Sequence, residues 1–586
     1  MRFATPPSHA QADASGWNRA LYPERARGSR QSHVKRADRG KRRTVATVNE
    51  TAPVLVLGPV LRYVGETAVS IWLETDRACD VEVLGRRVPT FEVAGHHYAL
   101  VVVDGLQPGS EQEYQVALDG VVRWPEPGSE FPPSVLRTLD PGRPQRLAFG
   151  SCRQAELPLP HGPDALDACA RRLARTPRDR WPDAMLLIGD QIYADETGPA
   201  ARRFIAQRRD PAVPPGGEAA DFAEYCALYQ EAWSDPAMRW LLSVLPTIMI
   251  FDDHDVHDDW NTSAAWRAEF EAKPWWRARI TGAFQSYWIY QHLGNLSPAE
   301  LAADETWREV RQAHDAAAVL ANFALRADHR DTGIRFSVRR DFGNVRVVVI
   351  DSRSRRVIDD NSKRLMVDQA EWEWVTESVT GDWDHVVLAT SLPLLLPGGI
   401  HGIEAWNEAV CAGAWGRRLA RTGERVRQAL DLEHWAAFGQ SFENFERLLS
   451  GLGTGSYGTP PASVTVISGD VHNSYLAPAS LPGTASRSAI WQAVCSPVHN
   501  VLPSHFRRGY QFAESRVGGL LGTALARLAG VRKPRIRWQI SRGPWFDNML
   551  ATLEFDGRRA RIRFDRATRD ARGTGQLELA CETDLA

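Results

Sequence analysis

Long apolar runs, paired cysteines and a large net charge are all missing from this sequence. No stretch is apolar for long enough to span a bilayer. The seven cysteines are scattered without paired spacing, so we expect reduced thiols and a cytoplasmic protein rather than a disulfide framework. The formal net charge of −2 gives no reason to expect a membrane surface or a stably bound nucleic acid as a partner.

The first 51 residues differ in composition from the rest of the chain. They are polar and contain a basic run at 29–43. Asn49, Glu50 and Pro53 interrupt the sequence after this run, so no apolar segment follows it and we do not expect a signal peptide. We predict a disordered basic extension over residues 1–51 in preference to a nucleic-acid-binding arm.

The 586 residues are too many for one core, and the pattern changes twice along the chain. Over residues 52–140, short apolar runs are separated by Gly, Pro or Asp, which predicts a small β-sandwich domain. Residues 106–114, LQPGSEQEY, resemble the Leu-x-Pro-Gly…Tyr turn of fibronectin-type sandwiches. This resemblance implies that the Tyr114 hydroxyl ties down a corner of the domain.

From residue 141 to residue 586, strand-like and helix-like segments alternate, which predicts an α/β domain with a layered mixed sheet. Asp368, followed three residues later by Glu371, predicts a capping box at the start of one helix. The segments 262–330 and 403–450 are mostly helical in pattern, and we interpret them as insertions. Two strand-like runs flank Asp556-Gly557, which predicts a terminal hairpin.

Oxygen, nitrogen and sulfur donors follow several of the predicted α/β strands. The donors are Cys152, Asp190, Tyr193, Asp252, Asp253, His254, Asp255, Asp351, Asp470 and His472. One such Asp is most often a helix cap, and one such His is most often a hydrogen-bonded core residue. Ligands bind at the carboxyl ends of strands in open α/β sheets, however, and crowded carboxylates need a cation. We therefore predict a metal site in which Asp190 bridges two ions.

Four motifs at these strand ends carry a resemblance to a known family. FGSC, GDQIY, FDDHD and SGDVH, in this order, resemble the motifs of PhoD-like phosphatases (the alkaline phosphatase D family). This family belongs to the calcineurin-like metallophosphoesterase superfamily. The resemblance runs from about residue 145 to residue 480, and it implies a metallophosphoesterase core with helical insertions, preceded by the β-sandwich.

The resemblance also implies roles for individual residues. Cys152 corresponds to a thiolate ligand of iron, Asp190 to the bridging aspartate, and Tyr193 to a phenolate ligand of ferric iron. Asp253 takes the place of an asparagine as ligand of the second metal. The family's metals are ferric iron with calcium, and manganese or magnesium are the alternatives.

The remaining motif residues extend this set. His254 corresponds to the histidine that faces the phosphate, and Asp470 with His472 replaces a His-x-His pair of the superfamily. Arg353 matches an arginine that is common in the family. Arg353 either meets a phosphate oxygen or forms a structural ion pair, and the sequence leaves both open.

One further histidine of the superfamily has no clear counterpart. His401 is the nearest candidate, and we expect it to lie in a glycine-rich loop. Asp258, Asp259 and Asn261 are alternative oxygen donors for the second metal, or else they belong to a solvated loop. The identity of one second-metal ligand is therefore open.

The function we predict is metal-dependent hydrolysis of a small-molecule phosphomonoester or phosphodiester by attack of a metal-bound hydroxide. No Gly-x-Ser-x-Gly nucleophile motif is present at a strand-to-helix turn, so no covalent intermediate is needed. One alternative is a phosphodiesterase specific for nucleic acid or phospholipid head groups. Another is a non-catalytic ligand-binding protein with a vestigial site. The sequence does not specify the oligomeric state.

Overall fold

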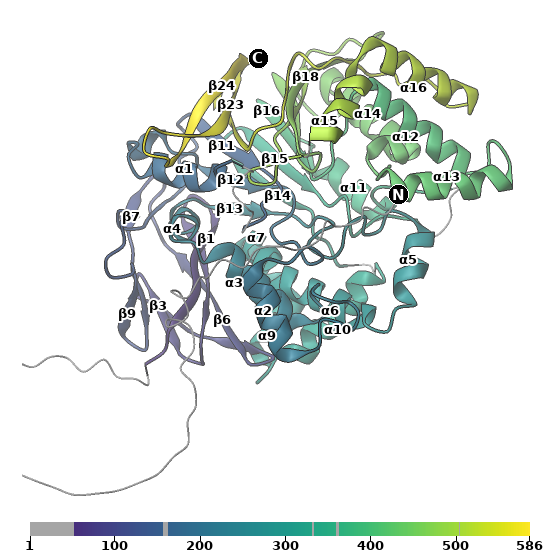
Figure 1. Ribbon diagram of the computed structural model, residues 1–586. Helices are drawn as coiled ribbons and strands as arrows, with labels where there is room; N and C mark the ends of the chain where they lie inside the picture. The colour runs from purple at the N-terminus through teal and green to yellow at the C-terminus, as the bar shows by residue number, and fades with distance from the viewer. Residues whose placement is uncertain (1–51, 156–161, 331–332, 359–362, 503) are drawn as a thin grey trace, which may run out of the picture. The chain divides into compact units, whose positions relative to one another are not determined.

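The computed structural model describes residues 52–155, 162–330, 333–358, 363–502 and 504–586 (Figure 1). The predicted basic extension over 1–51 lies outside the described residues. Residues 53–586 form one compact unit by their contacts. No helix in the described part of the chain is long and apolar enough to cross a bilayer.

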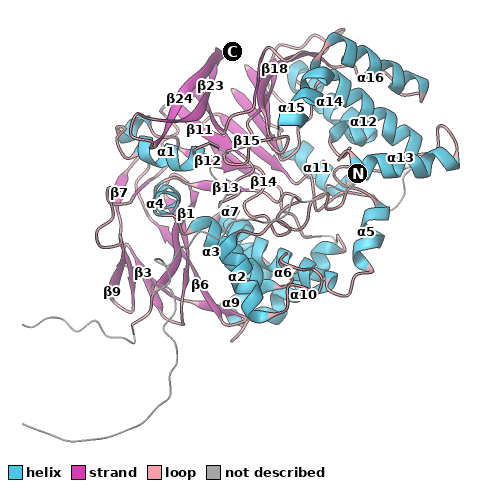
Figure 2. Cartoon of the chain, in the orientation of Figure 1, coloured by secondary structure: helices cyan, strands magenta, loops and turns pink. Residues whose placement is uncertain are grey.

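The predicted β-sandwich is present as two antiparallel sheets of four strands each (Figure 2). The first sheet has the order β1 (Leu55–Val64), β2 (Ala68–Thr75), β6 (His96–Asp104) and β5 (Phe91–Val93). The second has the order β4 (Arg86–Pro89), β3 (Asp80–Val83), β8 (Val116–Leu118) and β9 (Val121–Trp124). A separate pair joins β7 (Glu111–Glu113) and β10 (Val135–Arg137).

Both faces of the first sheet are buried, and β2 is accordingly buried along almost its whole length. Ile71 and Leu73 pack into the core shared with the second sheet. Trp72 points the other way, because side chains alternate along a strand, and in the main core it stacks on Tyr98 and contacts Tyr290 at a tilt. The sandwich is therefore packed on the α/β core as a scaffold.

Two further sheets form the α/β core. The six-stranded sheet has the order β13 (Thr247–Met249), β12 (Ala184–Leu187), β11 (Gln145–Gly150), β22 (Met549–Asp556), β23 (Arg559–Arg569) and β24 (Gly575–Asp584). β11, β12 and β13 run parallel, whereas β22 and β23 form the antiparallel hairpin predicted at Asp556-Gly557. The sheet is therefore mixed, as the sequence predicts.

The eight-stranded sheet has a parallel centre and antiparallel edges. Its order is β14 (Val338–Phe342), β15 (Val345–Ile350), β16 (His385–Thr390), β17 (Ser463–Ser468), β19 (Ala489–Val494), β18 (Ser474–Ser480) and β20 (Arg537–Trp538), and β21 (Arg542–Trp545) pairs with β18. The central strands are buried on both faces, as parallel strands covered by helices are.

Helices cover these sheets and fill the segments between them. The first group is α1 (Ala165–Leu173), η2 (Arg178–Arg180), α2 (Pro199–Arg208), α3 (Phe222–Trp233) and α4 (Pro236–Val244). The second group is α5 (Ala264–Glu271), α6 (Trp276–Ser286), η3 (Tyr287–His292), α7 (Leu293–Asn295), α8 (Pro298–Ala303), α9 (Glu305–Gln312) and α10 (Ala317–Asp328). This second group is the predicted helical insertion at 262–330.

The later helices include the second predicted insertion. They are α11 (Gln369–Ser378), α12 (Gly398–Cys411), α13 (Arg417–Ala429), η4 (Trp435–Ala437), α14 (Gly439–Thr454), α15 (Ser504–Glu514) and α16 (Arg516–Leu528). Asp368 caps α11 by accepting the N–H of Glu371, as predicted. A capping box would also have the Glu371 side chain accept the backbone N–H of Asp368. The Glu371 carboxylate instead accepts from Nε of Arg335 at 3.1 Å.

Tyr114 joins the sandwich to the core. Its buried hydroxyl donates to the carbonyl oxygen of Ser243 at 2.6 Å, near the C-terminal end of α4. The corner contact implied by the fibronectin-type resemblance is therefore replaced by a contact with another part of the fold. The reason is that a helix C-terminus has carbonyl groups without intrahelical partners, and α4 lies against this sandwich edge.

We expect Tyr114→Phe to lower the free energy of unfolding by about 1–2 kcal/mol, because it leaves the buried Ser243 carbonyl without its donor. Urea denaturation measures this change. Tyr457→Phe is the matched control, because Tyr457 is only partly buried. An equal loss in both variants would contradict a specific role for the Tyr114 bond.

Candidate metal centre

The predicted donors converge where strands of the two core sheets end. Cys152 follows β11, Asp190 follows β12, and Asp253 follows β13, all in the six-stranded sheet. Asp470 and His472 follow β17 of the eight-stranded sheet. The rule that ligands gather at the carboxyl ends of parallel strands therefore holds across two sheets.

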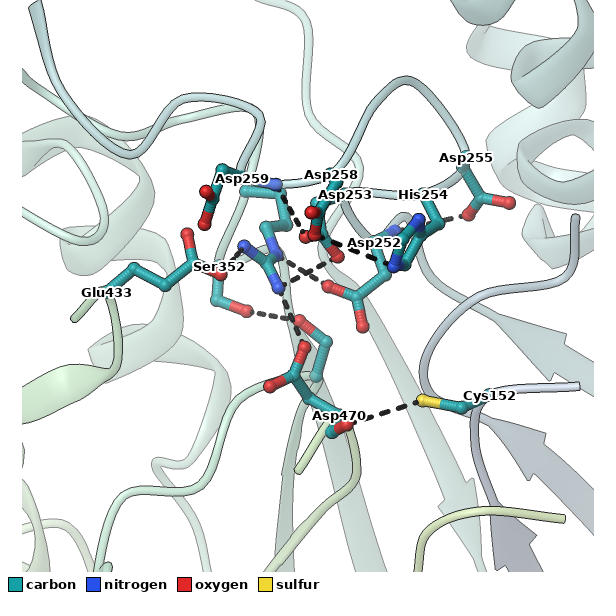
Figure 3. A network of polar contacts seen from close by, with 12 residues as sticks. Cys152, Asp252, Asp253, His254, Asp255, Asp258, Asp259, Ser352, Glu433 and Asp470 are labelled. Atoms are coloured by element: carbon teal, nitrogen blue, oxygen red, sulfur yellow. Dashed lines mark hydrogen bonds and ion pairs between the residues drawn. The ribbon is translucent and has the colours of Figure 1, made fainter. Parts of the chain in front are cut away.

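Three groups of side chains have ligand atoms within 4.8 Å of one another. The groups are Cys152 with Asp190 and His472, Asp190 with Asp252 and Asp253, and Asp253 with His254 and Asp258. Asp190 belongs to the first two groups, and Asp253 belongs to the last two. Figure 3 shows Asp252, Asp253, His254 and Asp258 close together, and Cys152 on another loop beside Asp470. Groups that share a carboxylate in this way fit more than one cation with a bridging ligand.

Several buried polar atoms in this region lack a hydrogen-bond partner among the described residues. They are Oδ1 of Asp190, Oδ2 of Asp252 and the hydroxyl oxygen of Tyr193. Burying such atoms unpaired is costly, so their presence fits a bound cation better than an apolar core. The donor set of thiol, phenol and carboxylates fits metal ions.

Burial and neighbouring negative charge act on the pKa values of these groups. Burial and the nearby Asp252 carboxylate raise the pKa of Asp190 well above its usual range. Burial and Asp190 likewise raise the pKa of the Cys152 thiol and of the Tyr193 hydroxyl. A bound cation reverses this effect, because it favours the deprotonated forms that serve as ligands.

Backbone geometry brings the three strand ends together around Ser151. A Cβ atom on Gly189 would lie 2.6 Å from Cβ of Ser151, and one on Gly469 would lie 1.9 Å from its Oγ. Both motif glycines therefore allow a close approach that no other residue permits. Cys152 and Asp470 have φ values of 58° and 66°, in the left-handed region that non-glycine residues rarely adopt.

His254 is oriented by an acid that the sequence analysis did not assign. Nδ1 of His254 lies 2.9 Å from Oδ1 of Asp195, and the ring centroids of His254 and Tyr193 are 4.6 Å apart. Although burial opposes it, His254 holds the pKa of the Asp195 carboxyl below its usual range. The sequence signal for Asp195 is its position two residues after Tyr193, on the same loop.

Arg353 is completely buried and contacts four carboxylates. Its Nε donates to Asp252 at 2.5 Å, and its Nη1 donates to Glu433 at 2.5 Å. Nη2 donates to Asp253 at 3.1 Å and to Asp470 at 2.9 Å. Of the two roles left open by the sequence, this geometry corresponds to the structural ion pair. Contact with a phosphate stays a prediction.

Two of the acids that follow strands bind backbone groups instead of lining the donor groups. The Asp255 carboxylate accepts the N–H groups of Gln191 at 3.3 Å and Ile192 at 3.2 Å, which joins two of the motif loops. Asp351 accepts the N–H of Ser354 at 2.9 Å. Asp255 and Asp351 therefore accept backbone N–H groups, which is the role considered above for a single Asp at the end of a strand.

The histidine near Asp470 is His434, and not His401. His401 lies in helix α12 and not in the expected glycine-rich loop, and it packs between Phe442 and Trp538 with ring centroids 4.8 Å away, outside the donor groups. Nε2 of His434 lies 3.2 Å from Oδ2 of Asp470. His434 is therefore a candidate for the missing second-metal ligand. No sequence signal marks it, because it follows α13 and not a strand.

The loop after His254 contributes one donor to the groups. The Asp258 carboxylate joins Asp253 and His254, whereas Asp259 donates its N–H to Oδ2 of Asp253 at 3.0 Å. Nδ2 of Asn261 donates to the carbonyl oxygen of Arg353. Asp258 is therefore the candidate that the structure favours among the three alternatives in this loop.

We expect Arg353→Lys to lower the free energy of unfolding by about 3 kcal/mol, because lysine keeps the charge but loses the planar fork that holds several carboxylates. Denaturant unfolding measures this change. Arg558→Lys, in the exposed ion pair with Asp384, is the control and is expected to change it by less than about 0.5 kcal/mol. Unchanged stability with an increased KM would instead assign Arg353 to the phosphate.

Comparisons with known proteins agree with this architecture. Residues 52–136 match a family described as a domain of unknown function, DUF7800. Residues 151–516, more than half of the chain, match the PhoD-like phosphatase family. A solved structure described as "Structure of PhoD" has a TM-score of 0.56 and 14% sequence identity, and the match covers 92% of this chain and 94% of that chain. None of the curated proteins matches this chain. The chain belongs to the PhoD-like phosphatase family, and it is a metal-dependent phosphoesterase with a mixed α/β core.

Proposed function

We propose that this protein hydrolyses phosphomonoesters, phosphodiesters or both, with water as the nucleophile, at the site centred on Asp190. The observation that carries the proposal is the shared position of Asp190 in two donor groups, together with its buried, partnerless oxygen. A carboxylate in that position can hold two cations a few ångströms apart, as in-line displacement at phosphorus by two metal ions requires.

The donor types favour iron with calcium, and manganese or magnesium are the alternatives. Cys152 and Tyr193 supply a thiolate and a phenolate, which suit a transition metal such as iron. Asp253 and Asp470 supply carboxylate oxygens, which suit calcium. His472 joins the group of Cys152 and Asp190. When bound, the metal ions would supply Lewis-acid catalysis and lower the pKa of a coordinated water.

His254 is the residue we assign to the phosphate. The contact of Nδ1 with Asp195 fixes the orientation of the ring, and it leaves Nε2 on the side of Asp258, 3.7 Å from its carboxylate. From there Nε2 can donate to a phosphate oxygen as negative charge develops on it. Asp195 acts as a positioning residue, because it holds the His254 ring and accepts the backbone N–H of Asp258 but is not itself a member of the donor groups.

The function is tested by parallel assays with p-nitrophenyl phosphate and bis(p-nitrophenyl) phosphate, together with elemental analysis of the purified protein. We expect turnover of at least one ester, and loss of both bound metal and turnover in Asp190→Ala, by a factor of about 1,000 or more in rate.

Normal activity with retained metal in this variant would refute the bridging role. Turnover of the diester alone would favour the phosphodiesterase alternative. A metal-loaded protein that hydrolyses neither ester would favour the vestigial site.

We expect Tyr193→Phe to lose the visible absorption that a phenolate bound to ferric iron produces, because phenylalanine has no oxygen ligand. Absorption spectroscopy and iron content measure this without reference to turnover. Tyr98→Phe, at a buried tyrosine of the sandwich, is the control and is expected to keep the absorption. A wild-type protein that binds iron without a visible band would refute the assignment of Tyr193 as a ligand.

A further inference from the structure

Helix α16 has its small residues inside and its large apolar residues outside. Gly518, Gly522 and Ala526 form the buried face. The opposite face carries Val517, Leu520, Leu521 and Leu528, which are 58%, 72%, 53% and 72% exposed. A helix on the surface of a water-soluble domain normally buries its large apolar side chains, so α16 has the reverse arrangement.

The buried face of α16 packs so closely on α12 that larger residues would not fit. A Cβ on Gly402 would lie 2.4 Å from the carbonyl carbon of Gly522, and one on Gly522 would lie 2.6 Å from the carbonyl oxygen of Gly399. Helices that pack in lipid use small residues in this way and leave leucine and valine on the outside. The packing therefore fixes which face of α16 is presented outward.

More exposed apolar side chains lie near this face. Phe512 of α15 is 56% exposed, and α15 packs against α16. The Trp415 indole donates to the carbonyl oxygen of Leu528 at 3.2 Å, which places the exposed start of α13 next to the end of α16. In Figure 1, α16 and α13 lie together with α12 at the edge of the described part of the chain. The apolar face therefore extends beyond a single helix.

The same region is strongly basic. Between Ser515 and Phe546 the sequence has no acidic residue, and it has seven basic ones, namely Arg516, Arg527, Arg532, Lys533, Arg535, Arg537 and Arg542. All but Arg542 line one cavity of about 750 Å³ beside α16. Arg447 also lines this cavity, and four glutamates, Glu408, Glu443, Glu446 and Glu514, do so as well, which leaves a net positive charge at its wall. Basic side chains and the apolar face are therefore adjacent.

We propose that the outward face of α16 (Val517, Leu520, Leu521 and Leu528) docks on an anionic lipid surface, with the neighbouring basic residues contacting the head groups. Apolar side chains that enter the interface, together with Lys and Arg that contact anionic lipids, are the two signals that stable peripheral binding needs. The overall charge of −2 does not oppose this, because charge attraction acts over about one Debye length and so depends on the local patch.

Charge and side-chain type disfavour the other occupants. Residues 1–51 have eleven Lys and Arg against four Asp and Glu, so this segment would be repelled by the basic region. A second copy of the chain would place like charges opposite each other. Single-stranded nucleic acid binds basic grooves through stacking on aromatic rings, whereas the exposed face of α16 is aliphatic.

The proposal is tested by flotation of the full chain with vesicles of phosphatidylcholine, with or without about 30% phosphatidylserine. We expect about tenfold more protein on the anionic vesicles, and loss of this binding by about tenfold in the variant with Leu520→Ser and Leu521→Ser. Arg532→Gln with Lys533→Gln and Arg535→Gln is expected to remove the preference for anionic vesicles. Hydrolysis of p-nitrophenyl phosphate without vesicles is expected to stay unchanged in both variants, which separates this proposal from the catalytic one.

The matched control carries Val121→Ser and Val122→Ser on β9, whose side chains are 45% and 50% exposed and lie in the sandwich. It is expected to bind vesicles like the wild type. Equal binding to neutral and anionic vesicles, or unchanged binding of the leucine variant, would overturn the proposal. A wild-type dimer that the leucine variant converts to a monomer in sedimentation analysis would also overturn it, and would assign the face to a second copy of the chain.

Discussion

Buried negative charge between two sheets is the constraint on which the rest of this structure depends. Asp190, Asp252 and Asp253 are buried and Asp470 beside them is partly buried, so their repulsion is screened less than it is at a surface. Arg353 contacts three of these four acids, and Oδ1 of Asp190 has no hydrogen-bond partner among the described residues. Bound metal ions would supply the positive charge that balances these acids, which is why the arrangement is a candidate metal centre.

Close packing of the loops and sheets holds these acids together. Ser151 contacts the loops of both core sheets, and glycines at positions 189 and 469 allow that approach. Residues with left-handed backbone, such as Cys152, persist only where the surrounding packing determines them. The sandwich contributes to that packing, because one face of its first sheet is part of the main core. A domain without any predicted ligand thus supports the site.

The candidate metal ligands and the exposed apolar face lie on different parts of the fold. The candidate ligands come mainly from loops after strands, whereas the exposed apolar face belongs to α16, which lies in the chain between β19 and β20 of the eight-stranded sheet. Loops on a rigid scaffold can position reactive groups accurately. Substitutions on the outer face of a peripheral helix do not disturb the core. If α16 docks on anionic lipid, the enzyme would act close to a membrane even though none of its described helices can cross one.

The sequence by itself determined the class of fold and the donors at strand ends, because apolar runs that stop at Asp, Cys or His are local patterns that need no knowledge of packing. Only the tertiary structure decided which side chains or backbone groups each of these residues contacts. It placed Asp255 on backbone groups, Arg353 among carboxylates, and His434 beside Asp470. It likewise joined Tyr114 to α4 and turned the leucines of α16 outward. Such contacts link residues that are distant in the chain, so no local pattern of the sequence contains them.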